Sequence, residues 1–242
     1  MSDSPRVRKC KAIRDRIYNR EQFASYILKK EVLKSLTSES TVVDIGCGRK
    51  AKFLRSLSPH VKTAYGIDLE ISETIVEDNI QVMYGDAQNI PLPEHSIDVV
   101  TMVNVSEHLR DPERVFLECK RILKPYGSLF LIASSKFYPP IWIGRAIPHC
   151  IRQWANSIIT STEAEDTFPA YYKANSYRTL HRLSSLSGLD VVSIRYISNH
   201  PELFMFSTFV YRCSIAFERF FLQRDVFRFF RHEIFCHLNS PG

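Results

Sequence analysis

A short β-branched run ends in two glycines and carries an acidic residue. Residues 41–48 read TVVDIGCG, so Asp44 precedes Gly46 and Gly48. Glycine lets the backbone turn sharply and approach a ligand more closely than any residue with a Cβ. A carboxylate near the buried end of a strand is costly unless a group hydrogen-bonds to it. The Asp-x-Gly-x-Gly spacing therefore suits a turn that holds a cationic ligand, and a carboxylate that only caps this turn is the simpler alternative.

The same glycines fit a dinucleotide-binding pattern. Gly46, Gly48 and Ala51 satisfy G-x-G-x-x-A, and Asp68 lies twenty residues beyond Gly48. A nicotinamide-binding protein would explain these residues. It gives no reason for Asp44, for GDAQNIPLP at 85–93 or for KPYG at 124–127. We therefore rank this alternative second.

Five motifs in order make residues 20–197 resemble the class I S-adenosylmethionine-dependent methyltransferases, in particular the small-molecule methyltransferase type 11-like subgroup. The motifs are DIGCG at 44–48, GIDL at 66–69, GDAQNIPLP at 85–93, SIDVV at 96–100 with the following loop at 104–108, and LKPYGSL at 123–129. The resemblance implies S-adenosyl-L-methionine as cofactor and S-adenosyl-L-homocysteine as product. It also implies these cofactor-binding residues: Asp44, Gly46, Cys47, Gly48, Asp68, Leu69, Asp86, Ala87 and Asn104.

Two of these carboxylates have specific roles in the resemblance. Asp68 would accept hydrogen bonds from both ribose hydroxyls, because a carboxylate offers two acceptor oxygens to a vicinal diol. Asp86 would accept from the adenine amino group. Each also has a plainer interpretation: Asp68 as a solvated strand end, and Asp86 as a turn residue that binds its own backbone.

The reaction implied is in-line displacement at a sulfonium methyl, which is accelerated by holding the acceptor atom close behind that methyl. A hydroxyl acceptor needs a base, and histidine is well matched near neutral pH. His108 is the candidate catalytic residue, with His149 as a second candidate. Glu107 and His108 also resemble a metal-binding pair of some relatives, but Asn104 stands where the further carboxylate is needed, so we predict no metal site.

About 40 residues, 136–175, separate the fifth strand from the next helix, far more than the usual two to six. We expect this insertion to act as a lid over the acceptor. Its aromatic side chains either line an apolar acceptor pocket or pack the insertion onto the sheet. The candidate substrate-binding residues are Trp142, Phe168, Tyr171 and Tyr172.

The elements that must position these residues alternate between strands and helices. Apolar runs that suit burial on both sheet faces predict strands at 41–45, 63–68, 80–85, 97–105, 128–134 and 190–197, and helices are expected at 111–123 and 176–187. This pattern predicts an α/β fold with a parallel sheet. The resemblance implies that this fold is the Rossmann-like class I methyltransferase fold, with a mostly parallel, doubly wound sheet and helices on both faces.

Length favours one methyltransferase domain over residues 1–242. We expect a basic N-terminal helical arm at 1–40, a cofactor-binding half at 41–135, the lid insertion at 136–175, a last helix and strand at 176–202, and an aromatic helical extension at 203–242.

The extension is unusual because ten of the sixteen phenylalanines fall within 204–235, interleaved with arginines. Residues 203–222 fit a helix better than a strand, although a short seventh strand near 203–210 stays open. Its expected polar half holds Ser207, Thr208, Arg212, Ser214, Glu218 and Arg219, and its apolar half holds Phe206, Phe209, Cys213, Phe217 and Phe220. A basic, phenylalanine-bearing helix is typical of membrane-surface contact. Packing on the lid or a homodimer contact are the alternatives.

Composition narrows the class of protein. The net charge of +6 and the pI near 9.0 favour anionic partners without requiring nucleic acid. The amine-methylating motif N/D-P-P-Y/F/W is absent after the fourth strand, so we do not expect nucleic acid as the substrate class. Scattered cysteines, the polar N-terminus and the lack of long apolar runs predict a cytoplasmic protein, with peripheral membrane contact as an open option.

We expect methyl transfer to oxygen of a small-molecule or lipid-like acceptor. A cofactor-binding protein without turnover that serves as a docking module is the alternative.

Overall fold

A computed structural model describes residues 4–139, 169–198 and 204–242. The chain divides into two compact units, each of which is assembled from three stretches of sequence. The first, unit 1, comprises Met1–Tyr26, Ser135–Pro169 and Tyr196–Glu233, and the second, unit 2, comprises Ile27–Ser134, Ala170–Arg195 and Ile234–Gly242. Most of the expected lid insertion, 140–168, lies outside the described residues. The single domain over 1–242 stays a prediction.

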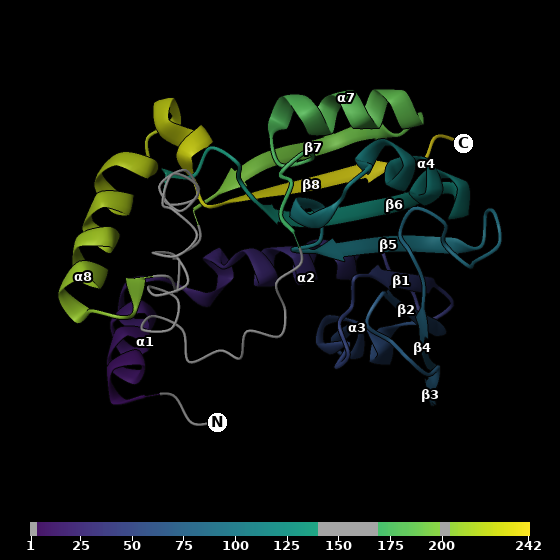
Figure 1. The fold of residues 1–242 in the computed structure, drawn as a ribbon, viewed down its shortest axis with the longest axis horizontal. Coiled ribbons are helices and arrows are strands. Elements are labelled where there is room, and N and C mark those ends of the chain that lie inside the picture. The colour runs from purple at the N-terminus through teal and green to yellow at the C-terminus, as the bar shows by residue number, and fades with distance from the viewer. Residues whose placement is uncertain (1–3, 140–168, 199–203) are drawn as a thin grey trace. The chain divides into compact units, whose positions relative to one another are not determined.

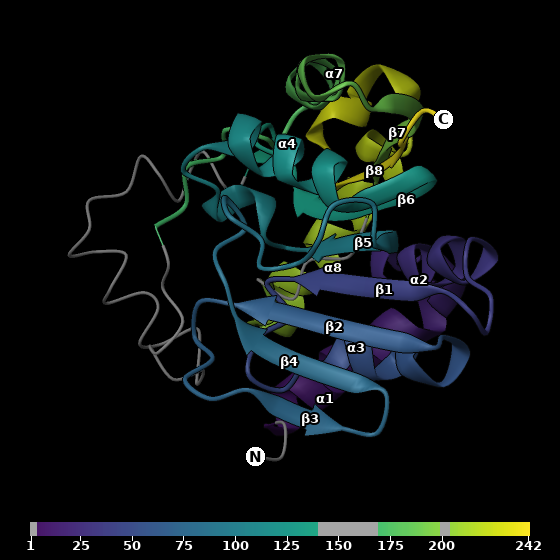
Figure 2. The ribbon, with the colours of Figure 1, turned by 90° about the vertical axis from the view of Figure 1, so that its right-hand side faces the viewer.

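An eight-stranded sheet forms the centre of unit 2 (Figures 1 and 2). Its order is β3-β4-β2-β1-β5-β6-β8-β7. The strands are β1 Thr41–Ile45, β2 Thr63–Asp68, β3 Ile75–Glu77, β4 Ile80–Tyr84, β5 Ile97–Val103, β6 Leu123–Ser134, β7 Asp190–Ile197 and β8 Glu233–Asn239. From β4 to β6 every neighbouring pair is parallel, whereas β3 is antiparallel to β4. The mostly parallel sheet confirms the predicted fold class.

Helices cover both faces of this sheet. α4 (Pro112–Ile122) and α7 (Tyr177–Ser187) pack together on one face, and α2 (Ala24–Lys34) and α3 (Lys52–Leu57) cover the other (Figures 1 and 2). The Asp111 side chain caps α4 by accepting from the Arg114 amide at 3.2 Å, and Pro112 occupies the first turn. Gly188 ends α7 with a left-handed φ of 70°. Both helices lie within one residue of their predicted bounds.

Unit 1 has a core of its own, built where α1 (Pro5–Ile17) meets α8 (Thr208–Phe217). The buried residues of this core are Cys10, Tyr18, Met205, Tyr211 and Ile215. After α8 the chain makes a π-helical turn over Glu218–Leu222 and a 3-10 helix over Asp225–Phe230. Glu218 is buried and accepts a 2.6 Å hydrogen bond from the Ser198 hydroxyl, although burial still raises the pKa of its carboxyl.

The C-terminal region corrects two expectations. It is not helical throughout, because 233–239 forms β8, which inserts between β6 and β7. The extension also keeps its phenylalanines on one side, but this expected apolar half is not the side that packs inward. Tyr211, Ile215, Glu218 and Leu222 are buried, while the phenylalanines of the expected apolar half lie on the surface. No helix in the described ranges has the length and apolarity needed to cross a membrane.

Candidate cofactor-binding site

Parallel strands bring the predicted residues to one edge of unit 2. β1, β2, β4 and β5 run in the same direction, so their carboxyl ends share one edge of the sheet. Asp68 pairs in register with Tyr84 at the ends of β2 and β4, and Asp44 pairs with Thr101 across β1 and β5. The strand order reverses direction at β1, and ligands of open α/β sheets bind at such a switch point.

The glycine turn after β1 needs glycine at two positions for different reasons. Gly46 and Gly48 have φ values of 69° and 66°, which side chains rarely adopt. A Cβ on Gly46 would collide with the Val105 side chain in the loop after β5. A Cβ on Gly48 would meet no atom within 4 Å. Gly46 therefore allows the two loops to pack, and Gly48 borders open space.

Asp44 lies at the buried side of this turn, with 2% of its surface exposed. The Thr101 hydroxyl donates a hydrogen bond of 2.7 Å to its Oδ1. Burial raises the pKa of Asp44 to about 7, Thr101 opposes this shift, and the Asp68 charge adds to it. A carboxyl with this pKa changes its charge near neutral pH, and a cation beside it would stabilise the charged form.

Asp68 anchors the glycine turn to the end of β2. Its Oδ2 accepts from the Gly48 amide at 2.8 Å, and its Oδ1 accepts from the Glu70 amide at 2.9 Å. Each carboxylate oxygen has a second lone pair, so these bonds leave acceptor capacity for a ligand diol. Asp68 is thus more than a solvated strand end, and its predicted ribose contact stays a prediction.

Asp86 follows β4 and organises its own turn. Its carboxylate accepts from the Gln88 amide at 2.9 Å, and its carbonyl accepts from the Asn89 amide at 2.9 Å. This is the turn role that the sequence left open. Asp86 and Ala87 are half-buried, so the turn arrangement does not occlude the carboxylate, and the adenine contact stays a prediction.

The remaining predicted cofactor residues differ in exposure. Leu69 is exposed after β2, and Asn104 is exposed after β5 with a left-handed φ of 56°. Strained backbone of this kind is concentrated at functional sites. Burial, with the neighbouring Asp44 and Asp68 charges, raises the pKa of the Cys47 thiol to about 12. Cys47 therefore contributes packing beside Gly66 rather than a reactive thiolate.

A second cluster, within the same unit, joins the loop after β5 to residues 171–175. The Glu107 carbonyl accepts from the amides of Tyr171 and Tyr172 at 2.7 and 3.1 Å. The Glu107 carboxyl is 7% exposed and has no hydrogen-bond partner at Oε2; Asn175 Oδ1 and Ser106 Oγ are also buried without partners. Burial raises the pKa of Glu107, against the charge of His108 and hydrogen bonds that include Asn175.

The candidate base and two of the candidate acceptor residues thus belong to one cluster. His108 is half-buried and directly follows Glu107, and Tyr171 and Tyr172 are tied to the same loop. Lys173 strengthens the link by donating to the Arg110 carbonyl at 2.8 Å. Trp142, Phe168 and His149 lie outside the described residues.

Sequence reasoning missed two residues of the site, Thr101 and Asn175, and it also missed the structural role of Glu107. Thr101 follows from no motif, because only strand register places it opposite Asp44. Asn175 sits at the N-terminal side of α7, where a polar residue resembles an ordinary cap; instead its Nδ2 donates to the Ser134 carbonyl at 2.8 Å. Buried orphan oxygens are visible only in three dimensions.

The residues at the carboxyl edge fit a nucleoside cofactor that carries a cation. Gly48 leaves open a space that a Cβ would enter, Asp68 keeps free lone pairs beside it, and Asp44 holds a buried carboxyl at the strand end. The described residues contain no group of three or more His, Cys, Asp or Glu side chains that could hold a metal ion.

Comparison with known proteins agrees with this geometry. Residues 43–131 match the methyltransferase domain family. Over 92 residues the chain is 34% identical to the demethylmenaquinone methyltransferase of Thermotoga maritima, covering 36% of this chain and 39% of that one. Over 99 residues it is 27% identical to the ubiquinone biosynthesis O-methyltransferase of Coxiella burnetii, covering 37% and 41%. The chain thus spans less than half the length of these curated relatives.

A solved structure extends the likeness beyond the matched segment. The geranyl diphosphate C-methyltransferase of Streptomyces coelicolor, in complex with S-adenosyl-L-homocysteine, matches with a TM-score of 0.59 and 14% identity, covering 89% of this chain and 74% of that one. At this identity the match concerns the fold. Residues 43–131 are thus similar to the methyltransferase domain family, and the solved structure shows that the fold of such a methyltransferase extends over most of the chain.

Proposed function

We propose that this protein transfers the methyl group of S-adenosylmethionine to an oxygen of a small, lipid-like acceptor. One observation carries the cofactor half of the proposal: Gly48 borders open space while its amide is held by Asp68, next to the buried Asp44. This arrangement offers acceptors for ribose hydroxyls and a carboxylate for a cation within a short stretch of the sheet edge.

The names of the relatives support the acceptor class. One is named for demethylmenaquinone and one for ubiquinone biosynthesis, and the solved structure is a C-methyltransferase of geranyl diphosphate. Each of these names refers to a small molecule that is apolar or isoprenoid. The second relative is an O-methyltransferase, which favours oxygen, whereas the solved structure is a C-methyltransferase and makes carbon the alternative.

The proposed reaction needs no covalent bond between the substrate and the protein. Bound S-adenosylmethionine would supply an electrophilic methyl group whose bond to sulfur breaks as the bond to the acceptor oxygen forms. The chain must hold the acceptor in line and take up its proton, for which His108 is the candidate. Tyr171 and Tyr172, tied to the Glu107 carbonyl, would border the acceptor. Trp142 and Phe168 complete the predicted acceptor lining.

A cofactor-binding protein without turnover is the second candidate, with the C-terminal region as a partner or membrane docking module. The exposed phenylalanines of unit 1 favour this docking role, and they equally allow a homodimer. Turnover separates the two candidate functions.

Calorimetry with S-adenosylmethionine, S-adenosylhomocysteine and NAD tests the cofactor assignment. We expect both adenosyl ligands to bind in the low-micromolar to submillimolar range, as cofactors near their working concentrations do. Incubation with methyl-labelled S-adenosylmethionine and a panel of hydroxylated quinones and prenyl alcohols then tests transfer. Binding of NAD alone would overturn the family's cofactor here, and binding without transfer to any panel member would favour the docking candidate.

A further inference from the structure

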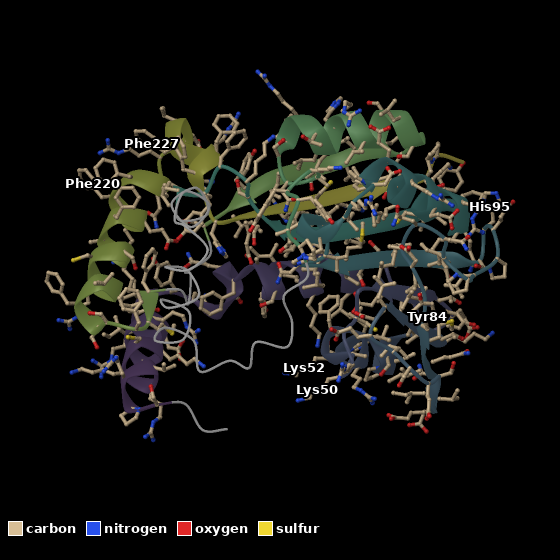
Figure 3. All side chains as sticks on the ribbon, in the orientation of Figure 1. Lys50, Lys52, Tyr84, His95, Phe220 and Phe227 are labelled. Atoms are coloured by element: carbon tan, nitrogen blue, oxygen red, sulfur yellow. The ribbon has the colours of Figure 1, made fainter. Side chains whose placement is uncertain are left out.

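Unit 1 exposes an aromatic face that its own core does not use. Phe209 and Phe220 are 77% and 60% exposed. Rings in the following turns touch one another, with centroids of Phe220 and Phe221 4.9 Å apart and those of Phe221 and Phe227 6.2 Å apart. Figure 3 shows Phe220 projecting outward beyond α8, with Phe227 on the next segment. We call this set the aromatic face; its exposed members are Phe206, Phe209, Phe217, Phe220, Phe221, Val226 and Phe229.

The exposure is a property of how α8 packs. Tyr211 and Ile215 turn inward onto Cys10 and Tyr18 and thereby satisfy the unit's core. Phe209 and Phe217 lie on the other side of the same helix. Phe217 joins the ring contacts through Phe221, with centroids 5.0 Å apart. Contiguous apolar surface of this kind is rare on a soluble monomer and marks a site of interaction.

Arginines are interleaved with these rings. Arg212, Arg219, Arg224 and Arg228 are exposed, and the guanidinium groups of Arg224 and Arg228 lie over Phe220 and Phe229 at 4.9 and 5.2 Å from the ring centroids. Within 204–231 the acidic residues are Glu218, which is buried, and Asp225. The exposed charge of the face is therefore strongly positive and complements an anionic surface.

A groove between α1 and α8 adds a site with the same chemistry. Its volume is about 210 Å³, its apolar lining comes from Ile13, Ile17 and Ile215, and Arg16 and Arg212 complete it. α1 itself carries six basic residues and a single acidic one, Asp15, which pairs with Arg14 at 2.9 Å. A small, half-open apolar groove flanked by two guanidinium groups suits part of a hydrocarbon chain attached to a phosphate.

We propose that unit 1 docks on membranes that contain anionic phospholipid, with the aromatic face in the interfacial layer and one phospholipid held in the α1–α8 groove. Transfer of phenylalanine rings to the boundary between headgroups and acyl chains is favourable, and arginines pair with lipid phosphates. A nucleic-acid duplex would be contacted by arginine and polar groups and would leave most of these rings in water. This proposal does not depend on methyl transfer.

Vesicle sedimentation of the full chain tests the proposal. We expect binding to vesicles of phosphatidylcholine with about one third phosphatidylglycerol, little binding to pure phosphatidylcholine, and at least a tenfold loss between about 0.05 and 0.5 M salt. Phe209→Ser with Phe220→Ser should weaken binding at least about tenfold. Arg16→Glu with Arg212→Glu, which line the groove, should weaken it on the order of 100-fold.

Controls separate membrane docking from its rivals. Arg178→Glu, an exposed change on α7 of unit 2, should leave vesicle binding within about twofold. Soluble glycerol phosphate at millimolar concentration should not release the protein, because it lacks the hydrocarbon chain. Equal binding to neutral and anionic vesicles, or no binding at low salt, overturns the proposal. So does a stable dimer in sedimentation equilibrium that Phe209→Ser with Phe220→Ser dissociates, because the face is then covered by a second copy.

Discussion

The Thr101 hydroxyl donates a 2.7 Å hydrogen bond to Asp44 across the β1–β5 pair, directly beside the glycine turn. Thr101 is fully buried and its partner is nearly so. The bond stabilises the charged carboxylate, but it does not offset the cost of burial, and the pKa of Asp44 rises to about 7. The pKa of a carboxyl on β1, the strand at which the sheet order reverses, thus lies near neutrality.

The first prediction is a pH dependence of stability that belongs to Asp44. Its pKa is about 7 in the folded protein and 3.8 for an unperturbed group, so the folded state holds the proton more tightly. Its contribution is therefore fully present below about pH 4 and is lost as pH rises toward 7. Urea unfolding should show that the free energy of unfolding of the wild type falls, relative to that of Asp44→Asn, as pH rises over this range. Parallel pH profiles would contradict the raised pKa.

The second prediction is that substitutions of Gly46 and Gly48 lower the stability by different amounts. Gly48→Ala should cost about 1–2 kcal/mol of stability from its positive φ alone. Gly46→Ala should cost about 2–4 kcal/mol, because the new Cβ also meets Val105. Adding Val105→Ala to Gly46→Ala should recover part of this loss in thermal unfolding and recover none in Gly48→Ala. Equal costs for the two glycines would mean that the loops do not pack as described.

Gly48→Ala has a further expected effect on ligand binding. Its Cβ would enter the open space beside the turn, so affinity for S-adenosylhomocysteine in calorimetry should fall at least about tenfold. Unchanged affinity would place the cofactor away from Gly48.

The third prediction concerns Asp68, whose two oxygens each accept from a backbone amide. Asp68→Ala should weaken cofactor binding by about 1.5–3 kcal/mol, and loss of the Gly48 anchor should also cost about 1–3 kcal/mol of stability. Asp68→Asn keeps one acceptor oxygen and should retain more stability than affinity. Glu70→Ala, which leaves the Glu70 amide in place, is the matched control and should change both by less than about 0.5 kcal/mol. Loss of stability with affinity intact would make Asp68 purely structural.

The sequence was informative where local pattern decides structure. The bounds of β1, β2 and β7 agree with the predicted runs, because each is a short β-branched stretch bounded by turn residues. β6 begins at Leu123 rather than 128, since Leu123 already pairs with Ile97, and the register then shifts before Ser128 pairs with Val99. β3 was missed because three residues carry too little pattern to predict an edge strand.

The sequence was uninformative where a distant neighbour decides. The helical wheel of α8 correctly separated Phe209 and Phe217 from the polar side, but periodicity does not show which side has a partner. α1 supplies that partner for Tyr211 and Ile215. β8 was likewise hidden, because its seven residues become a strand only by pairing with β6 and β7, which lie far earlier in the chain. Among the site residues, the partner of Asp44 depended on register in the same way.

The last prediction tests the roles of His108 and Glu107 in transfer to a hydroxyl acceptor. His108→Ala should leave the dissociation constant of S-adenosylhomocysteine unchanged and lower kcat roughly 10²–10⁴-fold, the range of a lost general base. Glu107→Gln keeps the size of a buried side chain whose carboxyl carries an orphan oxygen, so it isolates the charge. If the Glu107 carboxylate supports the protonated imidazole, this variant should lower kcat and shift the acidic limb of the kcat–pH profile to lower pH. Tyr177→Ala, exposed on α7, serves as the control and should leave the profile unchanged. Unchanged kcat in His108→Ala would remove the histidine from the reaction, and an unshifted profile in Glu107→Gln would confine Glu107 to holding Tyr171 and Tyr172 in place through its backbone carbonyl.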